Sequence, residues 1–274
     1  MVNSLSDKKI AVIGSGKMGE ILISRMLATK AVRNDQLIAT DKNSKRVAFM
    51  KSTFGVEATT DNREAAAKAD IILLCLKPQV AREIISLFDD VVRDSQLIIS
   101  IMAGVSASLI EGYFTKDVAV MRAMPNTPSQ VGAGMTALAA GKYSDEQHFQ
   151  LTEDIFNSAG RTLRIDENHF DAVTALSASG PAFIYVIIEA LAEGGVKSGL
   201  PRDISTELAA QMTLGSAKMV IDSGMHPAIL KDHVTTPAGC TIDGLLKLEE
   251  GGLRVTLIKA VAEATKRAKE LVNG

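Results

Sequence analysis

Cysteine is scarce in this sequence, and its charges nearly cancel. The 274 residues include two cysteines, Cys75 and Cys240, which are too few for a disulfide framework or for a metal site of their own. There are 30 Lys and Arg residues against 32 Asp and Glu residues, so no net field attracts nucleic acid or an anionic membrane. We therefore expect no bound metal and no nucleic-acid partner.

Long apolar runs are missing as well. The first residues are polar and charged, unlike a signal segment, and no uninterrupted apolar run reaches the ~20 residues that span a bilayer. These absences predict a soluble cytoplasmic protein that does not bind membranes. A chain of 274 residues is long enough to form two domains.

The first part of the chain alternates short apolar segments with amphipathic ones. Strands are predicted at residues 9–13, 36–40, 69–76 and 96–101, with helices between them. Continuous apolar strands separated by helices are typical of a parallel sheet covered on both faces. Three more strands, at residues 118–122, 135–140 and 161–165, are predicted at the far edge of this sheet.

Beyond Asp166 the β-branched runs end, and the sequence becomes rich in Ala, Leu, Met and Gly. Helices are predicted at residues 181–197, 202–223, 241–250 and 253–272. The whole pattern predicts an α/β fold, with a Rossmann-type doubly wound domain in residues 1–166 and an all-helical domain in residues 167–274.

One predicted helix is apolar on every side. Residues 183–188 read Phe-Ile-Tyr-Val-Ile-Ile, and a helix of this kind has to be buried all round. A domain of about a hundred residues has few elements that can cover it, so a partner subunit is the expected cover. The helical domain is therefore predicted to form an obligate dimer, with a self-sufficient helical bundle as the alternative.

Three glycines follow the first predicted strand in the pattern Gly14-x-Gly16-x-x-Gly19. Between a strand and a helix, this pattern is typical of a loop that binds a dinucleotide pyrophosphate at the helix N-terminus. Gly14 permits a tight turn, Gly16 a close approach of the backbone to phosphate, and Gly19 close packing of helix and strand. The predicted cofactor-binding residues of this loop are Gly14, Ser15, Gly16, Lys17, Met18 and Gly19.

The end of the second predicted strand affects the choice of cofactor. A carboxylate of Asp41 at the last strand position accepts hydrogen bonds from a ribose 2′-hydroxyl and repels a 2′-phosphate, which favours NADH. If the strand ends at Thr40, Asp41 turns outward, and Lys45 and Arg46 can meet a phosphate, although both are equally typical of a solvated helix start. Thr40 and Asp41 are predicted cofactor residues, and the choice between NADPH and NADH stays open.

Three further loops follow predicted strands. They contain Lys77-Pro78, Ala103-Gly104 and Asn126. Ligands of open α/β sheets bind outside the carboxyl ends of the strands, so these residues are predicted to face the cofactor. Asn126 lies between two prolines, and its amide can both donate and accept, which suits recognition of nicotinamide or substrate.

Two clusters of small and hydroxyl residues, at 177–182 and 234–242, each precede an apolar helical stretch. Such a turn presents backbone N–H groups and hydroxyls at a helix N-terminus, which suits a small carboxylate. Ordinary helix entries with Ser and Thr caps are the alternative. Ser179 in the first cluster and Gly239 in the second are predicted to contact the substrate.

These motifs together make the sequence resemble the pyrroline-5-carboxylate reductase family, from the glycine loop to the final helix. The matching segments are Lys77-Pro78, Met-Pro-Asn-Thr-Pro at 124–128, Ser-Ala-Ser-Gly-Pro-Ala at 177–182, Gly-Gly-Val-Lys-Ser-Gly-Leu-Pro at 194–201, the loop at 234–242, and Leu-Glu-Glu-Gly-Gly-Leu-Arg at 248–254. Each segment alone is unspecific, whereas the set is highly specific.

The resemblance implies reduction of a cyclic imine with one carboxylate, 1-pyrroline-5-carboxylate, to L-proline, the last step of proline biosynthesis. The reductant is NADPH or NADH, with NADPH slightly favoured by the resemblance. Val234, Thr236 and Thr241 match family positions that hold the substrate, with Thr241 near the ring nitrogen as the predicted catalytic residue and backbone amides on the carboxylate. An active site across a dimer, and in many members a decamer of five dimers, are also implied.

Three positions depart from the family pattern. Ala178 replaces the usual Gly, and Ala238 replaces the first of two usual glycines, so each loop is expected to be slightly stiffer. His233 stands where many members have Asn, which leaves its contact open.

The chemistry agrees with this resemblance. No Tyr-x-x-x-Lys pair, metal cluster or His–carboxylate dyad is apparent, although carbonyl reduction usually needs such a group. A protonated imine becomes a neutral amine on receiving hydride, so it mainly needs orientation. Glu189, Lys197 and His226 are interpreted as structural.

Two alternatives belong to other functional classes. A β-hydroxyacid dehydrogenase carries a catalytic Lys, with Asn or Asp one turn later, on the first helix of its second domain, where this chain has Ile184 and Ile188. A non-catalytic dinucleotide-sensing protein would not need the intact loop at 234–241.

Overall fold

The computed structural model describes residues 4–270, which form two compact units. The sheet unit contains residues 4–179 and 264–270, and the helical unit contains residues 180–263. The predicted domain boundary, after residue 166, follows the last strand. The compact units separate later, after Ser179, and the predicted boundary stays a prediction.

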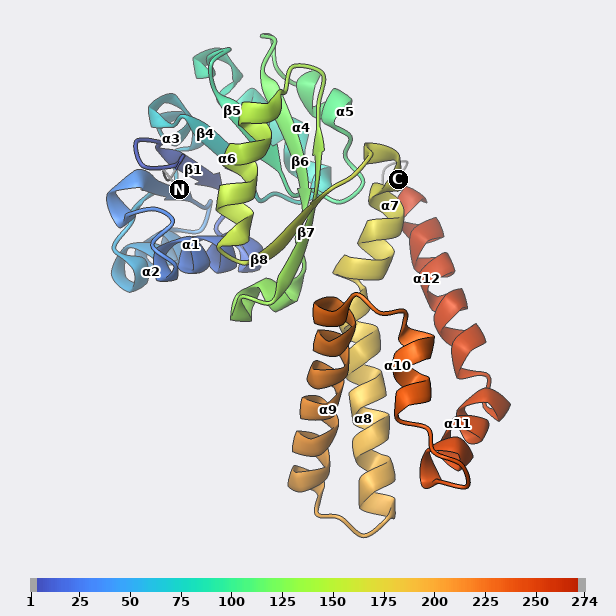
Figure 1. Cartoon of the computed structure of the whole chain (residues 1–274). Helices are drawn as coiled ribbons and strands as arrows, with labels where there is room; N and C mark the ends of the chain where they lie inside the picture. Colours follow the sequence, from blue (N-terminus) through green and yellow to red (C-terminus); the bar gives the residue numbers. More distant parts are fainter. Residues whose placement is uncertain (1–3, 271–274) are drawn as a thin grey trace. The chain divides into compact units, whose positions relative to one another are not determined.

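The sheet unit is built on eight strands in the order β3-β2-β1-β4-β5-β6-β7-β8 (Figure 1). The strands are β1 (Ile10–Ile13), β2 (Leu37–Thr40), β3 (Glu57–Thr59), β4 (Ile71–Leu74), β5 (Leu97–Ser100), β6 (Ala119–Met124), β7 (Gly134–Ala140) and β8 (Gly160–Arg164). All neighbours pair in parallel except β6 and β7. This order confirms the α/β class and the doubly wound sheet.

All the predicted strands are present, and one strand was missed. β3 has three residues, of which Ala58 alone is buried, so it lacks the apolar run that marks the other parallel strands. It pairs with β2 through Ile38, Ala39 and Thr40 at the edge of the sheet.

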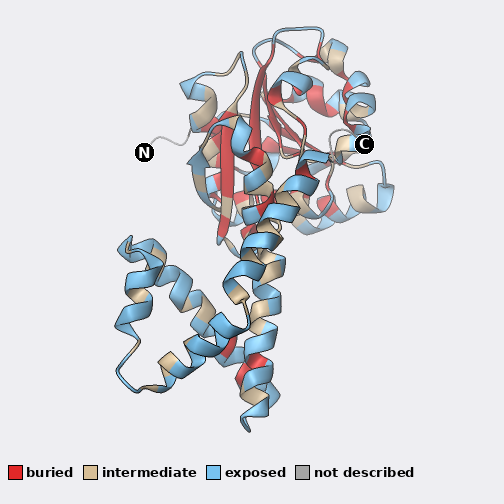
Figure 2. Ribbon diagram, turned by 90° about the vertical axis from the view of Figure 1, so that its right-hand side faces the viewer, coloured by how far each residue is buried: buried red, intermediate tan, exposed pale blue. Residues whose placement is uncertain are grey.

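Helices cover both faces of the sheet. They are α1 (Lys17–Ala28), α2 (Ser44–Phe54), α3 (Asn62–Lys68), α4 (Ala81–Ser86), α5 (Ala107–Glu111) and α6 (Glu146–Asn157). Alternate residues of β1 enter different cores: Ile10 and Val12 pack with α1, α2 and α6, whereas Ala11 and Ile13 pack with α3, α4 and α5. The buried residues in Figure 2 concentrate in this sheet and its helices.

The helical unit follows a short helical segment, α7 (Phe170–Val173), and a π-helical turn, Thr174–Ala178. Its helices are α8 (Gly180–Lys197), α9 (Arg202–Ser223), α10 (Pro227–His233), α11 (Cys240–Glu250) and α12 (Leu253–Glu270), the last of which ends in the sheet unit. The four predicted helices are confirmed within the described residues. α10 was missed because seven residues are too few for a clear helical period.

The helical unit buries little of its apolar surface. Among its residues, only Ala192, Ser205 and Ala209 are buried, whereas Tyr185 and Val186 of α8 are 62% and 63% exposed. The segment 183–188, which has to be covered on all sides, is therefore only partly covered by its own unit: Phe183, Ile187 and Ile188 are half-buried, and the other three residues are exposed. Figure 2 shows these helices almost wholly as exposed and intermediate residues.

One helical run among residues 4–270, Glu167–Lys197, is long and apolar enough to cross a membrane. Length and composition are the only grounds for this, and one such helix is weak evidence, since the core helix of a soluble protein meets the same criteria. The sequence pattern alone did not reveal this run, because hydroxyl residues and Gly180-Pro181 interrupt its apolar side chains.

Candidate functional site

The three glycines after β1 are required for three different reasons. Gly14 has a φ of +97°, and a Cβ atom there would lie 2.6 Å from the carbonyl oxygen of Cys75. A Cβ atom at Gly19 would lie 2.3 Å from the carbonyl oxygen of Gly14, so α1 packs directly on the loop. A Cβ atom at Gly16 would meet nothing within 4 Å. The loop is thus tight at both ends and open in the middle.

The N-terminus of α1 suits an anionic ligand. Gly16 occupies the N-cap position, and no side chain caps the helix. The first N–H groups of a helix have no intrahelical acceptor, so those of Lys17 and Met18 are directed at whatever lies before the helix. Open space at Gly16 and uncapped donors together fit a dinucleotide pyrophosphate.

Ser15 fixes the loop to the neighbouring strand. It is fully buried, and both its backbone N–H and its hydroxyl donate to the carbonyl oxygen of Thr40 at 2.8 Å. Ser15 therefore holds the loop in place through both its side chain and its backbone.

β2 ends at Thr40, which decides between the two predicted strand ends. The Thr40 hydroxyl is buried and donates to Asn62 Oδ1 at 2.6 Å. Asp41 lies beyond the strand, where its Oδ1 accepts the N–H of Asn43 at 2.9 Å. The Asp41 carboxylate thus closes a local turn.

Arg46 belongs to the loop rather than to the solvent. Its Nε donates to the carbonyl oxygen of Ser15 at 2.5 Å, and its guanidinium pairs with Glu20 of α1. Sequence reasoning gave Arg46 as a phosphate contact or a solvated helix start. The structure shows instead a side chain that supports the glycine loop, and the exposed basic residues nearby are Lys42 and Lys45.

The loops after β4 and β5 lie at the same edge of the sheet as the glycine loop, since the strands run parallel in register. Lys77 is exposed and Pro78 begins a short 3₁₀ turn, while Gly104 after β5 has a φ of +76°. Burial raises the pKa of the partly buried Cys75 thiol, which therefore stays protonated and is no nucleophile.

Asn126 uses its side-chain amide inside the sheet unit. Its Oδ1 accepts the N–H of Met135 at 3.0 Å, and its Nδ2 lies 3.3 Å from both the carbonyl and the hydroxyl oxygen of Ser177. The predicted contact of Asn126 with a cofactor stays a prediction, and the bonds to β7 and to the π-helical turn are new information.

The first hydroxyl cluster precedes α8, as predicted, but this helix does not begin with a free N-terminus. The chain is already helical from Phe170, and the N–H of Ser179 donates to the carbonyl oxygen of Thr174 at 2.9 Å. The Gly180-Pro181 pair is typical of a helix start, but here it lies within a helical run that widens into a π-helical turn. Backbone donors at Ser179 are therefore not free for an anion.

The second cluster does open a helix, as predicted. Gly239 is the N-cap of α11, no side chain caps this N-terminus, and Thr241 lies in the first turn. Val234 at the end of α10 is 65% exposed. Thr236 lies so close to Gly239 that a Cβ atom there would be 2.5 Å from the Thr236 hydroxyl oxygen. The substrate roles of these residues and of Ser179 stay predictions.

The same loop contains a backbone feature that the sequence did not reveal. Ala238 has a φ of +57°, in the left-handed region that favours glycine. This conformation suits the Gly that the family resemblance implies at the position. His226 caps α10 by accepting the N–H of Ala228 at 3.2 Å, which agrees with its structural interpretation.

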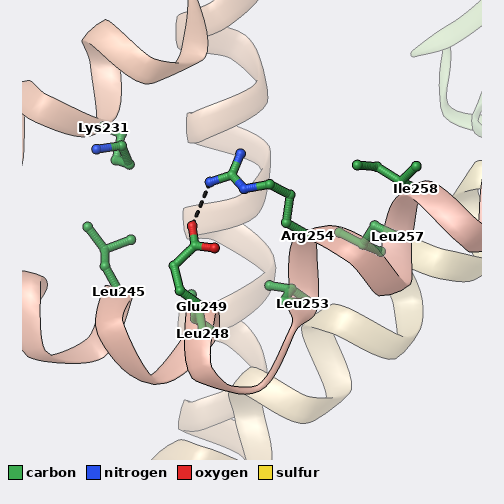
Figure 3. Close-up of a pocket in the computed structure, with 8 residues that line it drawn as sticks. All are labelled: Lys231, Leu245, Leu248, Glu249, Leu253, Arg254, Leu257 and Ile258. Carbon is green, nitrogen blue, oxygen red and sulfur yellow. Dashed lines mark hydrogen bonds and ion pairs between the residues drawn. The ribbon is translucent and has the colours of Figure 1, made fainter.

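The helical unit also contains a pocket of about 480 Å³ between α10, α11 and α12 (Figure 3). Leucines and Ile258 line most of it, and a salt bridge between Arg254 and Glu249, at 2.6 Å, lies across it beside Lys231. None of the predicted substrate residues lines this pocket.

Within residues 4–270, no group of three or more His, Cys, Asp or Glu side chains could hold a metal ion.

Family models match one segment in each of the two predicted domains. A family model described as pyrroline-5-carboxylate reductase dimerisation matches residues 167–271, and one described as NADP oxidoreductase, coenzyme F420-dependent, matches residues 9–104. The pyrroline-5-carboxylate reductase of Synechocystis sp. is 42% identical over 96% of this chain and 98% of its own length. That of Methanosarcina acetivorans is 38% identical over 97% and 99%.

Solved structures agree with these relatives. A pyrroline-5-carboxylate reductase from Coxiella burnetii has a TM-score of 0.90 and 34% identity, covering 96% of this chain and 98% of that one. The Plasmodium falciparum pyrroline carboxylate reductase, solved with NADP bound, has a TM-score of 0.87 and 30% identity, covering 97% and 99%. The chain therefore belongs to the pyrroline-5-carboxylate reductase family.

Proposed function

We propose that the protein reduces 1-pyrroline-5-carboxylate to L-proline with hydride from NADPH or NADH, the last step of proline biosynthesis. The observation that carries this proposal is similarity to reductases of this name over nearly the full length of both chains. The glycine loop supplies the cofactor site that the reaction needs. Neither a β-hydroxyacid dehydrogenase nor a non-catalytic sensor accounts for similarity of this extent.

The sheet unit holds the cofactor in this proposal. The cofactor supplies the hydride when bound. The backbone from Gly14 to Gly19 binds the pyrophosphate at the N-terminus of α1, because the space at Gly16 is open and the helix is uncapped. The loops at Lys77-Pro78 and Ala103-Gly104, together with Thr40 and Asp41, complete the proposed cofactor residues. The side-chain amide of Asn126 is already bonded to Met135 and Ser177, so we assign it to the support of the helical run that contains Ser177.

NADPH is the favoured cofactor in this proposal. Because β2 ends at Thr40, Asp41 is engaged with Asn43 and is not placed as the last strand residue that would accept a ribose 2′-hydroxyl. The exposed side chains of Lys42 and Lys45 are then available to a 2′-phosphate. If this is right, Asp41→Ser leaves the NADPH/NADH ratio of kcat/KM nearly unchanged, whereas Lys45→Ala lowers it.

The helical unit supplies the proposed substrate contacts. Thr241 orients the ring nitrogen, the backbone near Gly239 takes the carboxylate at the uncapped N-terminus of α11, and Thr236 and Val234 complete the contacts from this unit. Ser179, the last residue of the sheet unit before α8, is the remaining proposed substrate residue. Hydride adds to the imine carbon, and the electron pair of the C=N bond moves to nitrogen. The cationic imine thus becomes a neutral amine, so orientation replaces a strong acid.

We further propose that the helical unit forms an obligate dimer and that dimers assemble into a decamer in the cytoplasm, without nucleic-acid or membrane partners. The match of residues 167–271 to a dimerisation model and the exposed apolar side chains of α8 and α9 support the dimer. A second copy is then the cover for the helix that meets the criteria for a membrane span.

The direct test is oxidation of each nicotinamide cofactor, followed at its absorbance band, with pyrroline-5-carboxylate as substrate. We expect oxidation of both cofactors, faster with NADPH at low concentration, and formation of L-proline in equal amount. Folded protein that oxidises neither would contradict the proposal.

A further inference from the structure

The side chain of Asn126 joins three segments of the sheet unit. It lies directly after β6, accepts the N–H of Met135 in β7, and donates to both oxygens of Ser177 in the π-helical turn. Strands β6 and β7 are fixed by the hydrogen bonds of the sheet. The third segment contains Ser177, which lies 51 residues away in the sequence, so this amide sets where the turn sits.

Ser177 needs this donor because of Pro181. In an α-helix the carbonyl of residue 177 would accept the N–H of residue 181, but proline has no N–H, and its ring crowds that carbonyl. The helix widens there instead, and Ser179 donates five residues back to Thr174. Asn126 thus supplies the hydrogen bond that Pro181 cannot.

A second contact anchors the beginning of the same segment. Arg122 of β6 is 5% exposed, its guanidinium lies 4.3 Å from the centre of the Phe170 ring, and it donates to Glu167 Oε1 at 2.9 Å. The same carboxylate oxygen accepts the N–H of Ala107 at 2.7 Å. β6 and the loop after it therefore hold the segment from Glu167 to Ser177 at both ends.

We propose that Asn126 is a positioning residue that, together with Pro181, keeps the π-helical turn and so directs the Ser179 hydroxyl. The inference rests on the proposed function, in which Ser179 contacts the substrate. One residue of change in helical register rotates a side chain by about 100° around the helix axis. Loss of the turn would therefore aim Ser179 elsewhere while the glycine loop stayed intact.

Asn126→Asp is the sharpest variant, since it keeps the acceptor for Met135 and removes the donor to the Ser177 carbonyl. We expect the KM for pyrroline-5-carboxylate to rise about tenfold, with kcat and the Kd for NADPH each within about twofold of wild type. Pro181→Ala gives residue 181 an N–H that competes for the same carbonyl, and we expect the same KM change. The double variant should be no worse than either single one, because both act on one turn.

Two controls match the change in chemistry. Asn157→Asp alters an exposed Asn whose Oδ1 accepts the Thr162 hydroxyl at 3.1 Å, and Pro201→Ala alters the N-cap of α9. Neither should change the KM. A fall in NADPH affinity of Asn126→Asp equal to the rise in KM would overturn the inference, because it would show direct contact with the cofactor.

Amide hydrogen exchange tests the coupling without substrate. The Ser179 N–H should exchange about tenfold faster in Asn126→Asp than in wild type or in Asn157→Asp, since the turn loses its support. Unchanged exchange would overturn the inference. Wild-type enzyme that shows no turnover would instead contradict the proposed function. The exchange result would then decide whether Asn126 supports the π-helical turn.

Discussion

The sheet unit and the helical unit contain equally apolar segments but bury them to very different extents. In the sheet unit, Ile10, Val12 and Leu73 are fully buried between helices on two faces. In the helical unit, Leu208 of α9 is 56% exposed and Val186 of α8 is 63% exposed. The sheet unit buries its apolar side chains within one chain, whereas the helical unit leaves many of its apolar side chains exposed.

This difference shows where the free energy of folding arises in each unit. Burial of apolar side chains stabilises a protein roughly in proportion to the area removed from water. The sheet unit gains that stabilisation from its own chain. In the proposed dimer the helical unit gains it from a second copy, so its stability should depend on protein concentration.

The largest contrast is expected from one substitution made in each unit. Leu73→Ala in β4 should lower the free energy of unfolding by about 2–5 kcal/mol at any protein concentration, because it leaves a cavity in a complete core. Leu208→Ala should lower the Tm by an amount that grows as the protein is diluted. Thermal melts over a range of concentrations measure both. Equal concentration dependence for the two variants would contradict the contrast between the units.

A second contrast lies within the glycine loop. Gly14→Ala should cost about 2–3 kcal/mol of stability, because the backbone is left-handed there and the Cβ atom would meet the Cys75 carbonyl. Gly16→Val should leave the Tm unchanged and abolish cofactor binding, since its side chain enters the open space before α1. Chemical denaturation and fluorescence titration with NADPH separate these effects. Unchanged NADPH affinity of Gly16→Val would refute the role of the loop.

Thr241 provides the corresponding test in the helical unit. Thr241→Ala should lose a hydrogen bond to the substrate worth about 1–3 kcal/mol, which is roughly a ten- to hundredfold fall in kcat/KM with NADPH affinity nearly unchanged. Thr241→Ser should keep most activity. Steady-state kinetics and a melting curve on both variants distinguish this from a helix-capping role. A loss of stability without a kinetic loss would refute the substrate contact.

The smallest effect is expected at two residues, one in each unit, that are not glycine but have a left-handed backbone conformation. Ala238→Gly and Lys30→Gly should each stabilise the protein by up to about 1 kcal/mol, because φ values of +57° and +59° strain any residue with a Cβ atom. Only Ala238→Gly should also change kcat/KM, since its loop precedes Thr241. Denaturant titration and kinetics on the pair check this, and a kinetic effect of Lys30→Gly would argue against the assignment.

The fold was predictable where a local pattern decides the structure. Fully buried strands such as β1 and β4 appear as continuous apolar runs, and long helices such as α12 have clear periodicity. β3 and α10 escaped because three and seven residues give too little pattern. Tertiary contacts could not be predicted, because no local pattern in the sequence indicates them.

The candidate site shows the same limit. The glycine spacing was informative because the backbone and close neighbours require Gly14 and Gly19, while Gly16 leaves the space before α1 open. The helix after the Ser177 segment was predicted, since Gly180-Pro181 usually marks a helix start, but the helical structure that already precedes it from Phe170 was not. Arg122 was not recognised, since a single basic residue in an apolar strand gives no hint of its partner Glu167.

Sedimentation velocity of the full-length protein in detergent-free buffer, from assay concentration upward, tests the central contrast most directly. We predict a soluble dimer or a larger assembly of dimers, which Leu208→Asp dissociates into inactive monomers while Leu87→Asp, at a residue of the sheet unit that is equally exposed at 56%, leaves it intact. A monodisperse monomer that retains full reductase activity would contradict the claim that a second copy completes the helical unit.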